Sequence, residues 1–217
     1  MEKIENDLMK MFIEYRPLLP DAYKWEDEKD RWSELVFCVF SELSGLSTIK
    51  ARTIVSALSD LQVIGLDDLA ALLNDEGRVG VQNKNVEIIS SILQKNGVEK
   101  QNVDTVLLTL SQLARGIKNN YGRMQLFLRK YGQLMLDELD ESIKLTAVDK
   151  GVERYIYATW LQNILEFPLP LSNDSVQKFC MDENCSLEEV IDTADKLDIN
   201  VAMLDDILDI HYKVRAQ

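Results

Sequence analysis

Apolar residues recur along this chain at the spacing of amphipathic helices. Residues 31–43 show the pattern clearly, with one apolar stripe made of Trp32, Leu35, Val36, Val39, Phe40 and Leu43. Spacings of three and four residues place such side chains on one face of a helix. No run alternates apolar and polar residues over the length of a convincing strand. The pattern therefore predicts an all-α protein.

The same periodicity predicts helices over most of the chain. The predicted ranges are 2–14, 31–43, 47–61, 67–74, 84–96, 102–117, 121–138, 151–166, 173–181, 186–197 and 200–213. The breaks between them are marked by Pro17, Pro20, Gly65, Gly77, Gly80, Gly97 and the pair Pro168–Pro170. Ser186 and Glu189 have the spacing of a capping box, which predicts a helix start there.

The length of 217 residues is enough for a hydrophobic core without disulfides or metals. We expect a single all-α unit over residues 1–217, or two intimately packed helical subdomains with a cleft near residues 151–175. No apolar run approaches about 18 residues, so we expect no membrane span. The odd number of cysteines and the absence of a signal-peptide core favour a reducing, cytoplasmic location, associated with the nucleoid in a prokaryote.

The net charge of −13 opposes binding to nucleic acid, but the charges are unevenly distributed. Residues 180–209 contain ten acidic residues and one lysine, whereas residues 77–135 contain nine basic residues and three acidic ones. Both runs can be solvated helix faces, and the basic run can equally meet phosphates locally.

The motifs of several enzyme classes are missing. His211 is the only histidine, and Cys180 and Cys185 have no further Cys or His pair, which argues against a zinc or four-cysteine cluster site. The chain has no GxxxxGK[ST] phosphate-binding loop, no GxGxxG motif and no GxSxG nucleophile elbow. We therefore expect no metal and no cofactor, and we expect His211 to be structural.

Residues 144–179 are the most informative segment for function. A short loop containing Gly151 precedes a predicted amphipathic helix that runs to Phe167, and a Pro-bounded loop then leads to Asp174. At the start of the next helix, Asp174 can be an N-cap. A carboxylate in that position can also act as a catalytic acid or base. The residues alone leave both roles open.

This segment resembles the helix-hairpin-helix DNA glycosylase superfamily, the group that includes endonuclease III. The family pattern is close to L-P-G-V-G-x-K-T-A, then an apolar helix, then V-D-[TSH]. It is matched by residues 151–155 (GVERY), Ala158 and residues 173–175 (NDS). The resemblance implies a compact multi-helix glycosylase-like fold with a helix-hairpin-helix near residues 144–167.

The resemblance also implies base-excision DNA repair and a set of site residues. Asp174 would be the catalytic carboxylate that releases an alkylated or mismatched base from double-stranded DNA, in a protein that acts as a monomer. The base pocket would contain Tyr155, Trp160 and Glu42, and the DNA backbone would be bound by Lys144, Lys150, Gly151 and Arg154. Because Tyr155 occupies the position of the family's Schiff-base lysine, the implied enzyme is a monofunctional N-glycosylase.

Several departures from the family pattern favour other functions. Glu153 replaces the second hairpin glycine, Asp149-Lys150 replaces the leading L-P, and Glu42 replaces the intercalating glutamine. Carboxylates at a DNA surface repel phosphates. A non-catalytic helical scaffold that binds DNA or protein therefore stays open, as does an unrelated helical adaptor. For Trp160 and Tyr155, filling the core is the alternative to lining a base pocket.

Overall fold

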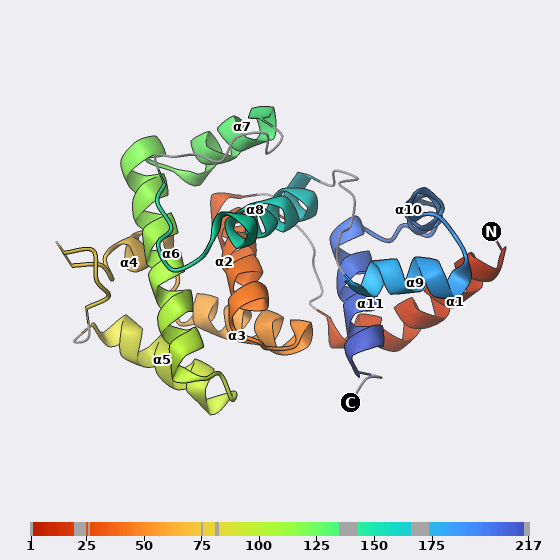
Figure 1. Cartoon of the computed structure of the whole chain (residues 1–217), viewed down its shortest axis with the longest axis horizontal. Helices are drawn as coiled ribbons and strands as arrows, with labels where there is room; N and C mark the ends of the chain where they lie inside the picture. The colour runs from red at the N-terminus through yellow and green to blue at the C-terminus, as the bar shows by residue number, and fades with distance from the viewer. Residues whose placement is uncertain are drawn as a thin grey trace. The chain divides into compact units, whose positions relative to one another are not determined.

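Helices make up most of the computed structural model of the chain, which describes residues 2–19, 25, 27–74, 76–80, 83–134, 143–165 and 174–214 (Figure 1). Within these ranges no residue belongs to a β-strand, and one isolated bridge pairs Leu73 with Val79. The prediction of an all-α fold is confirmed. No described helix combines the length and the apolar character that a membrane span requires.

The α-helices follow the predicted ranges, with ends that differ by a few residues. In chain order the elements are α1 (Glu2–Tyr15), the short 3-10 helix η1 (Arg16–Leu18), α2 (Glu28–Leu43), α3 (Thr48–Asp60), α4 (Leu66–Ala70), α5 (Lys84–Lys95), α6 (Lys100–Tyr121), α7 (Met124–Leu134), α8 (Lys150–Leu165), α9 (Asp174–Glu183), α10 (Leu187–Lys196) and α11 (Val201–Val214).

Side-chain caps determine where several helices begin. The Ser186 hydroxyl accepts the Glu189 N–H at 3.2 Å, and the Glu189 carboxylate accepts the Ser186 N–H at 2.8 Å, so the predicted capping box is confirmed. Hydrogen bonds from the Ser186 backbone and hydroxyl hold the pKa of Glu189 below its ordinary value. Asp27, Asn83 and Asn200 accept first-turn N–H groups at the starts of α2, α5 and α11.

The helix predicted over 67–74 ends earlier, with α4. Leu73 instead pairs with Val79 across a turn in which Gly77 adopts a φ of +74°. Glycine adopts a left-handed φ without steric cost, so a turn forms at Gly77. The helix therefore ends before Leu73, although the predicted range continues to residue 74.

The helix predicted over 121–138 begins later, with α7. Gly122 has a φ of +75° and terminates α6 in the left-handed conformation, donating its N–H to the Ile117 carbonyl at 3.1 Å. Residues 135–138 of that prediction lie outside the described residues.

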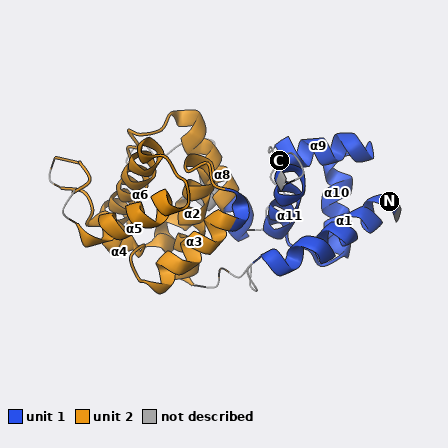
Figure 2. Cartoon of the chain, turned by 90° about the horizontal axis from the view of Figure 1, so that it is seen from below, with its two compact units in different colours: residues 1–24, 47–49, 161–217 blue, residues 25–46, 50–160 orange. Residues whose placement is uncertain are grey.

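The chain divides into two compact units (Figure 2). Unit 1 combines segments from both ends of the chain, Met1–Lys24, Ser47–Ile49 and Leu161–Gln217. Unit 2 consists of Trp25–Leu46 and Lys50–Trp160. The helices α3 and α8 each contribute residues to both units.

In unit 2, α6 is the central helix and contacts α2, α4, α5 and α7 (Figure 1). Its buried face is apolar along most of its length, as the 3.6-residue period predicts. On α7, Phe127 stacks on Trp160 of α8 with ring centroids 5.5 Å apart, and neither side chain is exposed. This aromatic contact joins α7 to α8.

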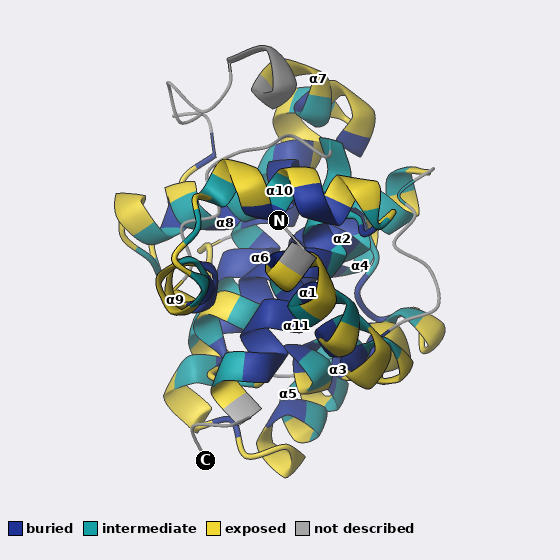
Figure 3. Cartoon of the chain, turned by 90° about the vertical axis from the view of Figure 1, so that its right-hand side faces the viewer, coloured by how far each residue is buried: buried dark blue, intermediate teal, exposed yellow. Residues whose placement is uncertain are grey.

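In unit 1, α11 is the central helix and contacts α1, α9 and α10. Most of its residues are buried (Figure 3), in agreement with a sequence that is apolar on most sides. His211, on α11, is buried with its Nδ1 at 3.2 Å from the Tyr15 hydroxyl oxygen. The histidine therefore has a structural partner inside the core of unit 1.

Candidate functional site

The predicted site residues fall into both units. Asp174 belongs to unit 1, whereas the predicted base-pocket and DNA-backbone residues belong to unit 2. Within the predicted helix-hairpin-helix range, the described residues form a non-helical segment up to Asp149 and then a single helix, α8. Residues 166–173, which include Asn173 of the NDS motif, lie outside the described residues.

The segment before α8 lies along α6. Ile143 packs so closely on Gly116 that a Cβ atom there would lie 2.8 Å from the isoleucine side chain. Gln112, one turn before Gly116 on α6, donates its Nε2 to the Thr146 hydroxyl at 2.7 Å and accepts the Thr146 N–H at 2.8 Å. Lys144, directly after the buried Ile143, is exposed. Contacts with α6 therefore fix the position of Lys144.

Asp149 caps α8. Its carboxylate accepts the N–H of Gly151 at 2.8 Å and the N–H of Val152 at 3.0 Å. Gly151 lies in the first turn of α8, as the predicted helix over 151–166 implies, and the alternative expectation that it belongs to a preceding loop is wrong. A phosphate that approached the Gly151 N–H would have to displace Asp149 and would meet its negative charge.

Glu153 points into the protein. Its side chain has no exposed surface; one carboxylate oxygen pairs with the Lys150 ammonium at 2.7 Å, and the other has no hydrogen-bond partner among the described residues. The resemblance to the glycosylases places Glu153 at the DNA surface, but in the structure its carboxylate is buried. A buried carboxylate oxygen without a partner is costly. The spacing of three residues from Lys150 is the sequence signal for the ion pair.

The basic residues near the start of α8 are exposed. Lys150 and Arg154 lie one turn apart on α8, and Lys144 lies in the segment that leads into it. Lys150 remains 65% exposed despite its contact with Glu153. Three exposed cations of this kind can contact phosphates, although the nearby Asp149 carboxylate reduces the local positive charge.

The three predicted base-pocket residues differ in exposure. Trp160 lies in the core of unit 2, where its indole N–H donates to the Arg31 carbonyl at 2.9 Å. Trp160 therefore fills the core, which was the alternative to a role in a base pocket. In this conformation its ring is not exposed to a base. Tyr155 is partly exposed on α8, and Glu42 is exposed in the last turn of α2.

Asp174 is the first residue of α9, and its side chain is exposed. Its carboxylate makes no hydrogen bond and no ion pair with any residue in the described ranges. An N-cap would accept a first-turn N–H, and Asp174 accepts none from the described part of α9.

Ser175 anchors the first turn of α9. It is buried, and its hydroxyl donates to Asp209 on α11 at 3.2 Å. The same carboxylate accepts the Thr48 hydroxyl at 2.5 Å and pairs with Lys213 at 2.7 Å. Asp174 therefore stands next to a fixed residue. Sequence reasoning missed Asp209, because its partners Ser175 and Thr48 lie 34 and 161 positions away and share no local pattern with it.

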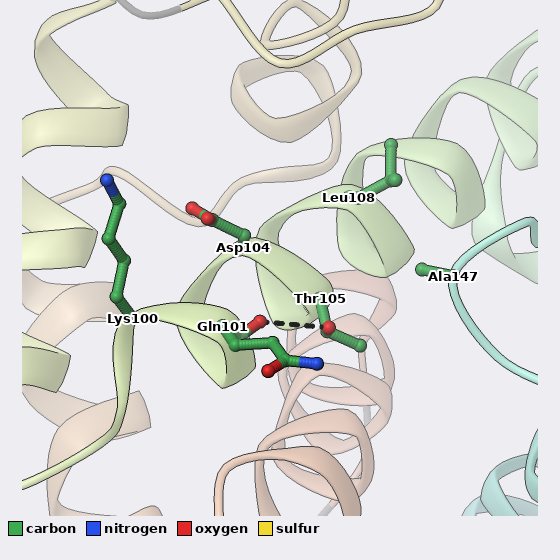
Figure 4. Close-up of a pocket in the computed structure, with 6 residues that line it drawn as sticks. All are labelled: Lys100, Gln101, Asp104, Thr105, Leu108 and Ala147. Atoms are coloured by element: carbon green, nitrogen blue, oxygen red, sulfur yellow. Dashed lines mark hydrogen bonds between the residues drawn. The ribbon is translucent and has the colours of Figure 1, made fainter.

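A cavity of about 400 Å³ lies at the N-terminal end of α6 (Figure 4). Its lining residues are Lys100, Gln101, Asp104, Thr105, Leu108 and Ala147. Ala147 comes from the segment before α8, and the Thr105 hydroxyl donates to the Gln101 carbonyl at 3.0 Å. No predicted site residue lines the cavity, and its mixed lining points to no particular ligand.

Among the described residues, no group of three or more His, Cys, Asp or Glu side chains is placed to hold a metal ion. Cys185 donates its backbone N–H to the Cys180 carbonyl at 3.0 Å. Burial raises the pKa of both thiols, and the neighbouring Cys180 adds to the shift of Cys185, whose pKa rises to about 11. The raised pKa values lower the thiolate fraction of both cysteines at neutral pH and so reduce their reactivity.

The resemblance to the glycosylases rests on the residue pattern of the sequence. No protein-family model, no curated protein and no solved structure matches the chain.

Proposed function

We propose that the chain is a monofunctional DNA N-glycosylase with Asp174 as its catalytic carboxylate. The observation that carries the proposal is the environment of this carboxylate. It is exposed, it has no partner among the described residues, and it stands next to the anchored Ser175. The pattern of residues 151–175, similar to that of the helix-hairpin-helix glycosylases, supplies the reaction class.

In the proposed reaction, the target nucleotide leaves the base stack at a cost of a few kcal/mol, which is smallest for a damaged or mismatched base. Positive charge develops on the sugar as the glycosidic bond breaks. The Asp174 carboxylate stabilises that charge or orients the attacking water.

Lys144, Lys150 and Arg154 supply the phosphate contacts in this proposal. Such contacts hold DNA in position without reading its sequence. Tyr155, partly exposed on α8, is the aromatic side chain that this proposal assigns to the base. A tyrosine forms no imine with an abasic sugar, so we expect base release without strand cleavage through a covalent intermediate.

A non-catalytic helical scaffold is the second candidate, and one observation favours it. The Asp149 carboxylate occupies the Gly151 and Val152 N–H groups at the start of α8. Those groups are the ones that the resemblance assigns to a phosphate. A scaffold that binds a partner elsewhere would not need them free.

The experiment measures base release from duplex oligonucleotides that each carry one lesion: uracil or thymine opposite guanine, an alkylated purine, or oxidised guanine. The Asp174→Asn variant is compared with wild type and with Asp192→Asn, which neutralises another exposed carboxylate, on α10. We expect wild type and Asp192→Asn to release one class of base, and Asp174→Asn to release none while its melting temperature stays within a few degrees.

Other outcomes separate the alternatives. Salt-dependent DNA binding without release supports the scaffold, and neither binding nor release supports an unrelated helical adaptor. A large loss of stability in Asp174→Asn would assign that carboxylate to the fold. Tyr155→Lys, tested by borohydride trapping, should introduce some strand cleavage if the tyrosine occupies the lysine position of the family.

A further inference from the structure

One face of α7 is basic. Arg123, directly before the helix, and Arg129 and Lys130 within it are exposed, and Leu126 beside them is 41% exposed. At 3.6 residues per turn, the four side chains spread over about a third of the helix circumference. We call Arg123, Arg129 and Lys130 the α7 basic face.

The two arginines of this face have no counter-charge in the described part of the chain. Arg123 and Arg129 form no hydrogen bond or ion pair with any described residue. Lys130 lies with its Nζ 5.6 Å from the centroid of the Tyr121 ring, within range of a cation–π contact. Lys118, by contrast, pairs with Asp67 at 2.6 Å and is left out of the face.

The α7 basic face belongs to a stretch without acidic residues. Residues 105–136 contain five basic residues and no Asp or Glu, in a chain of net charge −13. Acidic residues return directly afterwards, at Asp137, Glu138, Asp140 and Glu141. The local charge of α7 is therefore opposite in sign to that of the whole chain, which is the condition for a local attraction of anions.

Buried apolar side chains hold α7 in place. Met124 and Phe127 are buried, and the Phe127 ring also meets Tyr157 edge-on with centroids 5.9 Å apart. Figure 1 shows α7 following the end of α6 in unit 2. The packing of these apolar side chains fixes the backbone of α7, and Arg123, Arg129 and Lys130 stay exposed on it.

We propose that the α7 basic face binds the phosphate backbone of nucleic acid. Arg123 and Lys130 are separated by about 10 Å along the helix axis, a length over which one DNA strand carries about three phosphates. Two of the three residues are arginines, whose planar guanidinium groups match phosphate oxygens in pairs. This surface goes beyond the proposed base release, because it needs neither Asp174 nor the start of α8.

The test measures binding of the full chain to a fluorescein-labelled undamaged duplex and to its single strand, by anisotropy between about 50 and 200 mM salt. The variant Arg123→Gln/Arg129→Gln/Lys130→Gln is compared with Lys84→Gln/Lys95→Gln/Lys100→Gln. The control removes the same charge from exposed lysines of α5 and α6 in the same unit.

We expect the α7 variant to weaken binding about tenfold or more at the lowest salt and to reduce the log–log salt slope by about 3, with about 1 for each single substitution. The lysine control should keep most of its binding. Equal losses in both variants would overturn the proposal, since net charge alone would then explain binding. Unchanged DNA binding, with loss of self-association in sedimentation, would assign the face to an acidic segment of a second copy instead.

The result is independent of catalysis. Undamaged DNA reports the α7 contact even if no lesion is released, and base release can occur even if this contact fails. Circular dichroism and melting temperature check that the α7 variant folds, which we expect because all three side chains are exposed.

Discussion

The Arg52 guanidinium meets the Glu34 carboxylate through two parallel hydrogen bonds, from Nη1 to Oε2 at 2.5 Å and from Nη2 to Oε1 at 3.1 Å. Glu34, on α2, is 3% exposed, and Arg52, on α3, lies 3.5 Å above the centroid of the Phe37 ring. The Trp25 indole donates to the same carboxylate at 3.1 Å. Two opposite charges are thus buried together inside unit 2.

Arg52→Met should destabilise unit 2 by about 3–5 kcal/mol, because it leaves the Glu34 carboxylate buried without its counter-charge. The double variant Glu34→Leu/Arg52→Met should recover most of that loss, since no charge remains buried. Urea unfolding followed by circular dichroism measures both. A single substitution that costs less than about 1 kcal/mol would show that the pair is open to solvent.

Asp149→Ser should keep the cap of α8 and remove its charge. We expect stability to change by less than about 0.5 kcal/mol, whereas Asp149→Ala should cost about 1 kcal/mol through loss of the cap. If the start of α8 contacts DNA, Asp149→Ser should also bind a duplex more tightly than wild type at low salt, because a carboxylate no longer opposes the phosphate. Unchanged affinity would remove the start of α8 from the DNA surface.

Asp209→Asn should destabilise unit 1 by about 2 kcal/mol, since the charged acceptor of Ser175 and Thr48 is lost. Asp195→Asn, an exposed position on α10, is the matched control and should be neutral. Equal stability of the two variants in urea unfolding would contradict the anchoring role of Asp209. If Asp174 acts on DNA, Asp209→Asn should slow base release as well.

Cys185 should react slowly with iodoacetamide in the folded protein. Its pKa is raised to about 11 by burial and then by Cys180, so at pH 8 the thiolate fraction is about two hundredfold below that of the unfolded chain, where the pKa is about 8.5. Peptide-resolved mass spectrometry follows this cysteine separately from the other two. Equal rates in folded and unfolded protein would show that the thiol is not protected.

The same shift has a consequence for stability. A thiol whose folded pKa lies above its unfolded value stabilises the native state while it is protonated. Its contribution is complete below about pH 8.5 and is lost as the pH rises towards about 11. Cys185→Ser should therefore flatten the fall in stability over that alkaline range.

The helices were predictable because the apolar residues of each buried helix face recur every three or four positions in the sequence. The ends were less predictable: Gly122 terminates α6 inside a continuous apolar pattern, and the bridge at Leu73 cuts a helix short. The contacts of Glu34 and Asp209 were not predictable, because their partners are distant in sequence and come together only in the folded chain.

The candidate site was predictable only in part. The sequence pattern indicated a helix start at Asp174, and the structure places that residue first in α9 with an exposed side chain. It did not indicate that Asp149 would cap α8, although aspartate before a helix is a known cap residue. Helical spacing alone could not separate a core indole from a pocket indole, so Trp160 stayed ambiguous until its packing was seen.

Unit 1 is built from segments at both ends of the chain, and this determines the order in which the two units can fold. During synthesis every residue of unit 2 leaves the ribosome before the C-terminal part of unit 1 does, so α1 can pack on α10 and α11 only afterwards. The hydrogen bond from Trp160 to Arg31 joins positions 129 residues apart. Once unit 2 has folded, that long stretch acts as a short loop, which lowers the entropic cost of bringing the two ends of the chain together.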